Sequence, residues 1–192
     1  MELETYEWDS TWIEHTEETG KKRVFYIGDS ISNALRRECT AASGNEILFD
    51  GFASSKAVDN DYLCDSLRLF AGQLPSVSAV LFNSGLHGWH LADDSAYPGY
   101  YEKTINFLQG EFPSVPVIPV LTTRHGNGEF QKRVLARNEA VKKIAERLSL
   151  PVIDLFTESQ KYADCQLDDC HFNGEANKKL AAFLVCEVKK YL

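Results

Sequence analysis

The sequence predicts one α/β domain with a central five-stranded parallel sheet and helices on both faces. The chain has 192 residues, enough for one domain with a sizeable core. Short apolar runs rich in β-branched and aromatic residues alternate with longer segments of helical character. No internal repeat or low-complexity tract interrupts this alternation. Because strands that alternate with helices are joined by right-handed crossovers, the sheet should be parallel and covered on both sides.

The expected strands are the apolar runs at residues 24–27, 46–49, 79–83, 117–121 and 152–155. The expected helices lie at residues 31–40, 57–71, 100–110, 130–148 and 175–191. In the fourth helix, apolar side chains share one stripe and lysines and arginines lie opposite; the stripe contains Val134, Val141, Ile144, Ala145 and Leu148.

The first 23 residues form no obvious part of the predicted sheet. Their aromatic and apolar side chains, among them Trp8 and Trp12, are too many for a disordered tail. We therefore expect a segment at residues 1–23 that folds back on a domain at residues 24–192.

Composition excludes several classes of function. The net charge of −8 with no long basic stretch argues against nucleic acid or an anionic membrane as the partner. No apolar run approaches the roughly 18 residues that span a bilayer, and no signal peptide is visible. Five cysteines, an odd number, favour free thiols in a reducing compartment. We therefore expect a soluble cytoplasmic protein, and the oligomeric state stays open.

Two short motifs carry the residue types of an activated serine. Residues 24–32 read V-F-Y-I-G-D-S-I-S, so Ser30 lies where the first strand ends and the first helix begins. Far downstream, Asp168 precedes His171 by three residues, just before the last helix. Both motifs should meet at the C-terminal edge of the sheet, where such folds bind ligands. There a histidine can activate the serine while a carboxylate fixes the histidine tautomer.

These motifs resemble those of the GDSL hydrolases of the SGNH superfamily over about residues 22–192. The G-D-S at residues 28–30 matches the nucleophile block, and the D-x-x-H at residues 168–171 matches the last block. The resemblance implies a flavodoxin-like three-layer α/β/α sandwich and an esterase, lipase, thioesterase or carbohydrate deacetylase. It also implies that Ser30 is the nucleophile, His171 the base and Asp168 the residue that orients the base.

The block after the third strand departs from the family pattern. The family commonly has G-x-N-D, whose asparagine donates to the oxyanion, but residues 83–88 here read N-S-G-L-H-G. If Gly85 fixes the register, His87 replaces the asparagine and can donate one hydrogen bond in one tautomer.

In the family, a second inner block supplies a glycine amide to the oxyanion hole. Which residue of this sequence matches that glycine is open. Gly51 is the candidate, with Phe52 or Ala53 as the donor if the segment shifts. The Ser30 amide completes the expected oxyanion hole.

The expected substrate is a small acyl ester, and no cofactor is expected. We expect Asp29, Asn83, Trp89 and His90 to contact it, although Trp89 could instead pack in the core and His90 could lie in a loop. The aromatic and histidine-rich loop at residues 85–90 suits a neutral polyol, so an acetylated carbohydrate is favoured over other short-chain esters or thioesters.

Each motif also has a simpler interpretation. Ser30 could cap the helix, and Asp168 and His171 could lie in a solvated loop. The alternative function is a flavodoxin-like binding module in which Ser30, Ser32 and the helix N-terminus hold a phosphate or nucleotide. Cys165, Cys170 and His171 fit no common zinc spacing, so no metal site is expected.

Overall fold

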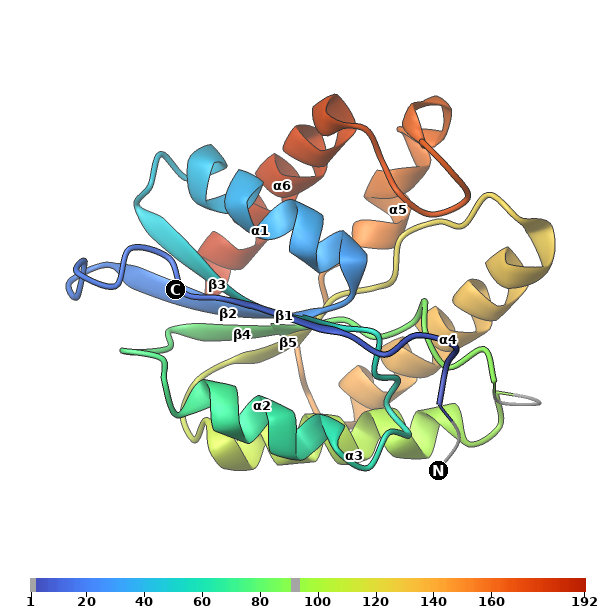
Figure 1. Ribbon diagram of the computed structural model, residues 1–192, viewed down its shortest axis with the longest axis horizontal. Helices are drawn as coiled ribbons and strands as arrows, with labels where there is room; N and C mark the ends of the chain where they lie inside the picture. Colours follow the sequence, from blue (N-terminus) through green and yellow to red (C-terminus); the bar gives the residue numbers. More distant parts are fainter. Residues whose placement is uncertain (1–2, 91–93) are drawn as a thin grey trace.

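The computed structural model describes residues 3–90 and 94–192, and in them a twisted five-stranded sheet lies between two helical layers (Figure 1). β2 (Lys22–Gly28) is central, with β3 (Ile47–Ser54) and β4 (Ala79–Phe82) paired parallel on its two sides. β5 (Val117–Pro119) continues the parallel sheet beyond β4. The predicted three-layer α/β/α fold is confirmed.

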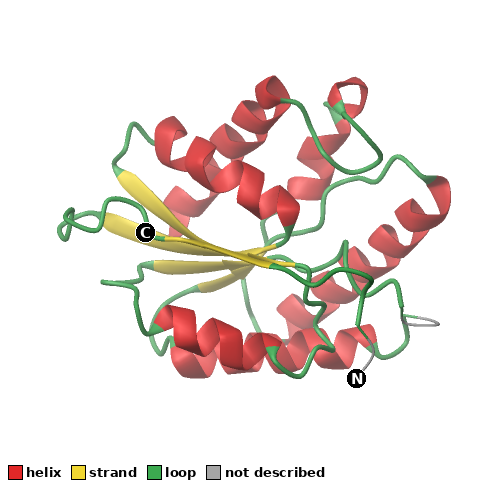
Figure 2. Ribbon diagram, in the orientation of Figure 1, coloured by secondary structure: helices red, strands yellow, loops and turns green. Residues whose placement is uncertain are grey.

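The two helical layers bury opposite faces of the sheet (Figure 2). One face is covered by α1 (Ser30–Ala42), α5 (Leu155–Gln160) and α6 (Gly174–Val188). The other is covered by α2 (Leu63–Ala71), α3 (Tyr97–Glu111) and α4 (Gly128–Arg147). Short 3-10 helices lie at Ala163–Cys165 and Lys189–Tyr191.

The central strand explains the continuous apolar run in the sequence. Val24 and Tyr26 pack into the core beneath α1 and α6, whereas Phe25 and Ile27 pack into the opposite core. Successive residues of a strand point to opposite faces of the sheet. Because helices cover both faces here, both sets of side chains are buried, and the strand shows no alternation of polar and apolar residues.

One edge strand differs from the prediction. β1 (Asp9–Trp12) comes from the segment expected to lie outside the sheet, and it pairs antiparallel with β3. The sheet is therefore mixed, with one antiparallel edge, and the sequence of β1, D-S-T-W, is too short and polar to show apolar alternation.

The expected strand at residues 152–155 is reduced to one parallel bridge. Ile153 pairs with Val120, and then Asp154 caps α5 by accepting a hydrogen bond from the Thr157 amide at 2.9 Å. The helix therefore begins where the strand would have continued. With this bridge included, the parallel part of the sheet has the flavodoxin-like strand order.

A buried ion pair holds the N-terminal segment against the sheet. Arg23 in β2 and Asp50 in β3 are fully buried and joined by hydrogen bonds of 2.8 and 2.9 Å. The Glu14 amide donates to Asp50 at 2.8 Å, and Arg23 donates to the carbonyls of Glu14 and His15.

Among the described residues, no helix is both long and apolar enough to cross a membrane.

Candidate active site

Ser30 is the first residue of α1, immediately beyond the end of the central strand. Asp29 is the N-cap and accepts a hydrogen bond from the Ile31 amide at 2.9 Å, so the capping role considered for Ser30 belongs to its neighbour. The Ser30 hydroxyl lies 2.7 Å from Nε2 of His171 instead. The first amides of a helix lack intrahelical partners and carry the positive end of the helix dipole, which favours negative charge beside Ser30.

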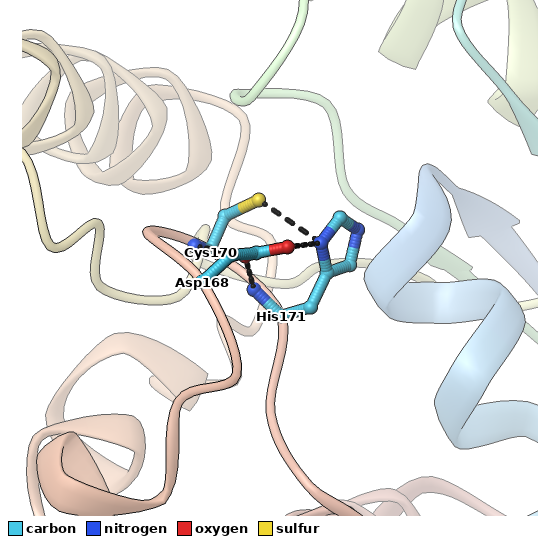
Figure 3. A group of neighbouring side chains, drawn as sticks. All are labelled: Asp168, Cys170 and His171. Carbon is cyan, nitrogen blue, oxygen red and sulfur yellow. Dashed lines mark hydrogen bonds and ion pairs between the residues drawn. The ribbon is translucent and has the colours of Figure 1, made fainter.

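Asp168 fixes the other side of the His171 ring (Figure 3). Its Oδ2 lies 2.8 Å from Nδ1 of His171, while its Oδ1 accepts from the amides of His171 and Cys170 at 2.7 and 2.8 Å. These two amides and the imidazole hold the pKa of the Asp168 carboxyl well below its usual range. An ionised Asp168 keeps the proton on Nδ1, so Nε2 presents its lone pair to Ser30.

The neighbouring Asp169 contributes its backbone carbonyl to the structure of this loop. Its carbonyl accepts hydrogen bonds from the Gly126 amide at 2.5 Å and from the Gln166 side chain at 3.1 Å. Cys170 is no rival to Ser30 as a nucleophile, because burial and the charge of Asp168 raise the pKa of its thiol to about 12. The structure thus brings together the three residues predicted as a triad.

His87 lies on the loop after β4 and lines the same cleft as Ser30 and His171. Its Nδ1 is 2.8 Å from Oε2 of Glu4, and the other Glu4 oxygen accepts from the Gly88 amide at 2.7 Å. Nε2 is therefore the ring atom left for a substrate.

The charge of the His87 ring depends on its acidic neighbours. Burial opposes the charge, but the hydrogen bond to Glu4 and the negative charges of Asp29 and Glu7 outweigh it and raise the pKa of His87. Since Nδ1 faces Glu4, Nε2 can donate a hydrogen bond when the ring is protonated.

A buried arginine shapes the loop that carries His87. Arg137 of α4 donates to the carbonyls of Gly85, His87 and Gly88 at 3.0, 2.5 and 3.2 Å. Asp94 balances its charge through hydrogen bonds of 2.8 and 3.0 Å.

Gly51 does not lie where the sequence placed it. It is inside β3 in register with Tyr26, and a Cβ there would meet Cδ of Arg36 at 2.5 Å. The glycine makes room for α1 and is not among the residues that line the cleft. Ala53 is level with Gly28, and Ser54 lines a hollow beside Asp29 and His87, so the end of β3 is where a second main-chain donor could lie.

Two residues that were expected to contact the substrate have structural positions within the protein instead. Asn83 donates through Nδ2 to the Val120 carbonyl at 2.9 Å and to the Thr122 hydroxyl at 3.1 Å, which ties β4 to the segment after β5. Asp29 is buried beneath the cleft, where burial raises the pKa of its carboxyl.

Trp89 and His90 line an open groove, and Trp89 also lines the cleft that contains Ser30. Nε2 of His90 is 2.9 Å from Asp59. Trp89 packs edge-on against Phe130, with ring centroids 4.7 Å apart, and carries Arg137 over its ring. The N-terminal segment supplies most of the remaining lining, which consists of Leu3, Glu4, Thr5, Tyr6, Trp8 and His87.

Sequence reasoning missed Glu4 and Arg137. Glu4 is 83 residues from His87 in the chain, and no local pattern connects them. Arg137 had a usable signal, because it lies one helical turn after Val134 on the apolar stripe, where a charged residue must be buried and paired.

Comparison with known proteins confirms the fold. No protein-family model and no curated protein matches the chain. A carbohydrate acetylesterase from Sinorhizobium meliloti matches with a TM-score of 0.70 and 13% identity, covering 90% of this chain and 100% of that one. A member of the lipolytic protein G-D-S-L family from Veillonella parvula matches with a TM-score of 0.69 and 22% identity, covering 89% and 100%.

A carbohydrate esterase family 3 structure from Talaromyces cellulolyticus matches with a TM-score of 0.68 and 16% identity, covering 88% and 97%. The predicted resemblance to the GDSL hydrolases therefore holds at the level of the fold.

Proposed function

We propose that the protein is a serine esterase that moves the acyl group of a small ester first to Ser30 and then to water. The observation that carries this proposal is the unbroken chain from the Ser30 hydroxyl to His171 at 2.7 Å and on to Asp168 at 2.8 Å. The fold shared with acetylesterases and a G-D-S-L protein supports it.

The geometry suits acyl transfer in two steps. Oγ of Ser30 attacks the ester carbonyl while Nε2 of His171 takes its proton, and His171 then gives that proton to the departing alcohol. A water molecule then attacks the acyl-enzyme in the same way, with His171 taking its proton and returning it to Ser30. Asp168 holds the ring and stabilises the imidazolium that forms in each step.

The developing oxyanion would be stabilised from three directions. The Ser30 amide lies at the positive end of α1. Nε2–H of His87 is the second donor, and a main-chain amide at the end of β3 replaces the expected Gly51 as the third.

The phosphate-binding alternative has less support. The α1 N-terminus that would hold a phosphate is capped by the carboxylate of Asp29, and the Ser30 hydroxyl is already bonded to His171. Asp168 lies behind that histidine, and its negative charge would oppose a second anion here.

The groove favours a neutral alcohol as the leaving group. Tyr6, Trp8 and Trp89 give it apolar ring faces, and the paired side chains of Glu4 and His87 add polar groups. Aromatic faces with nearby polar groups suit a sugar, and because these two charges are paired, the groove does not select an ionic one. We therefore propose an acetylated carbohydrate as the substrate class.

The test compares the wild type with Ser30→Ala for aryl acetate hydrolysis and for labelling by a fluorophosphonate. Loss of the nucleophile should remove nearly all turnover and labelling, because triad members act as a unit. Ser32→Ala, two positions further along the same helix, is the matched control and should keep both. Equal labelling of wild type and Ser30→Ala would contradict the proposal, and acetylated oligosaccharides tested beside aryl esters would decide the substrate class.

A further inference from the structure

The sequence spacing predicted no metal site, but from the structure we propose that Asp168, Cys170 and His171 form a zinc site whose occupation switches the catalytic base off. The binding part of this proposal stands on the geometry alone, and the inhibitory part rests on the proposed esterase function.

Three different ligand atoms face one another on this loop (Figure 3). Sγ of Cys170 is 3.4 Å from Nδ1 of His171, Nδ1 is 2.8 Å from Oδ2 of Asp168, and all three atoms lie within 4.8 Å of one another. Zinc bonds of about 2.3 Å to sulfur and about 2.0 Å to nitrogen set tetrahedral ligands roughly 3.5 Å apart. The thiol and the imidazole already have this separation, and the carboxylate needs only a small outward shift.

The ligand types select zinc over harder cations. Thiolate and imidazole are preferred ligands of Zn²⁺, whereas Mg²⁺ and Ca²⁺ take oxygen ligands. The Asp168 and His171 side chains are 55% and 43% exposed, so an ion can enter from solvent and retain water as its fourth ligand. Oδ1 of Asp168 is already held by the two main-chain amides, which leaves Oδ2 for the metal.

Zinc binding would place a proton on Nε2 of His171, the atom that has to accept the Ser30 proton in the proposed reaction. The ion takes the lone pair of Nδ1, so the proton that Nδ1 carried moves to Nε2 of the neutral ring. The S–H bond of Cys170 breaks, its proton goes to solvent, and a zinc–sulfur bond forms; the Asp168 carboxylate completes the protein ligands without losing a proton. Nε2 then carries hydrogen where it faces Ser30 at 2.7 Å, and it cannot accept the serine proton.

The binding test uses Ser30→Ala protein, which retains all three ligands and needs no activity. Zinc chloride is titrated by calorimetry, with a phosphine reductant that keeps the thiols reduced without binding the ion. We expect one zinc per chain, and adding Cys170→Ala should weaken binding at least about tenfold. Cys165→Ala, a nearby half-buried cysteine outside the cluster, is the control and should not change affinity. Affinity that is unaffected by Cys170→Ala, or no binding at all, would overturn the site.

The activity test follows aryl acetate hydrolysis with and without zinc chloride, each variant compared with its own zinc-free rate. Wild type and Cys165→Ala should be inhibited and should recover with EDTA, whereas Cys170→Ala should resist; magnesium chloride should inhibit none of them. Zinc that binds without inhibiting would overturn the switch. A wild type without esterase activity would contradict the proposed function and leave the calorimetric result to decide the site.

Discussion

Two imidazole–carboxylate pairs line one cleft, and the proposed mechanism gives them opposite tasks. In both pairs Nδ1 faces a carboxylate, from Asp168 for His171 and from Glu4 for His87. In the proposed mechanism Nε2 of His171 accepts the serine proton. Nε2 of His87 is to donate a hydrogen bond, and because Nδ1 of that ring faces Glu4, it can do so only when the ring is charged.

The first residue-scale prediction separates two adjacent carboxylates. Asp168→Asn should lower kcat by about ten-thousandfold, because the amide no longer fixes the tautomer of His171 or stabilises its cation. Asp169→Asn is the matched control and should be mild, since Asp169 contributes its carbonyl to the loop. Aryl acetate kinetics measure both, and a larger loss at Asp169 would show that the triad assignment is wrong.

The second prediction concerns the alkaline limb of the pH profile. The raised pKa of His87 keeps its ring protonated to higher pH, and the Nε2–H donor is lost as pH rises through that pKa. Glu4→Gln removes the main anionic partner, so the pKa should fall and the alkaline loss of kcat should begin at lower pH. Rate measurements across pH for wild type, Glu4→Gln and the surface control Glu18→Gln test this.

Other charges near His87 remain in Glu4→Gln. Asp29 and Glu7 still favour the protonated ring. Of the nearby cations, Arg137 donates to the carbonyls of this loop, that of His87 among them, and Lys56 is paired with Asp9. The alkaline limb should therefore shift without vanishing in Glu4→Gln, and it should vanish in His87→Ala. An unshifted limb in Glu4→Gln would exclude the charged-donor role.

Residues defined by short motifs were predictable from the sequence, and residues defined by distant contacts were not. Ser30, Asp168 and His171 each follow from a strand or helix boundary a few residues away. Gly51 was misplaced because strand register is set by pairing with β2, which the local sequence does not show. Glu4 was missed because its role depends on His87 in another part of the chain.

At the scale of elements, the loop after β4 is an irregular segment held by two neighbours. Arg137 of α4 binds its carbonyls from one side, and Glu4 binds the Gly88 amide from the other. Gly85 lies against Thr122, where a Cβ would be 2.0 Å from the threonine hydroxyl. The position of His87 therefore depends on close packing between backbone and side chain.

Gly85→Ala should displace this loop. Overpacking at such a site costs about 1–3 kcal/mol, and a displaced His87 should also lower kcat. Gly99→Ala in α3 is the control, because a Cβ there meets nothing within 4 Å. Thermal unfolding and aryl acetate kinetics on both variants test this, and unchanged kcat in Gly85→Ala would contradict the assigned role of the loop.

The parallel strands and helices were predictable because each carries its own apolar pattern. β1 was not, because its pairing is with β3 and its four residues contain only one large apolar side chain. The strand expected at residues 152–155 was interrupted because Asp154 favours a helix start after a single bridge.

At the scale of the whole molecule, the N-terminal segment is part of both the sheet and the cleft. β1 extends the sheet beyond β3, and Glu4 reaches His87. The Arg23–Asp50 pair anchors the turn that connects this segment to β2.

Asp50→Asn should strongly destabilise the fold. It leaves the buried Arg23 guanidinium without its counter-charge, which typically costs about 3–5 kcal/mol in free energy of unfolding. Asp65→Asn breaks an exposed pair with Arg68 and should cost less than about 1 kcal/mol. Urea denaturation of both variants measures the difference, and similar midpoints would contradict the anchoring role.

The packing of α1 against α6 also sets an order of events during synthesis. α1 leaves the ribosome early, but the helix that covers it and the loop that carries His171 are made more than a hundred residues later. Until then Ile31, Leu35 and Cys39 lack the α6 side chains that complete their core, and Ser30 lacks its hydrogen-bond partner His171. At about 5–20 residues per second, translation leaves this face partly uncovered for seconds or longer, so a chain that stalls before α6 exposes apolar surface and is prone to aggregate.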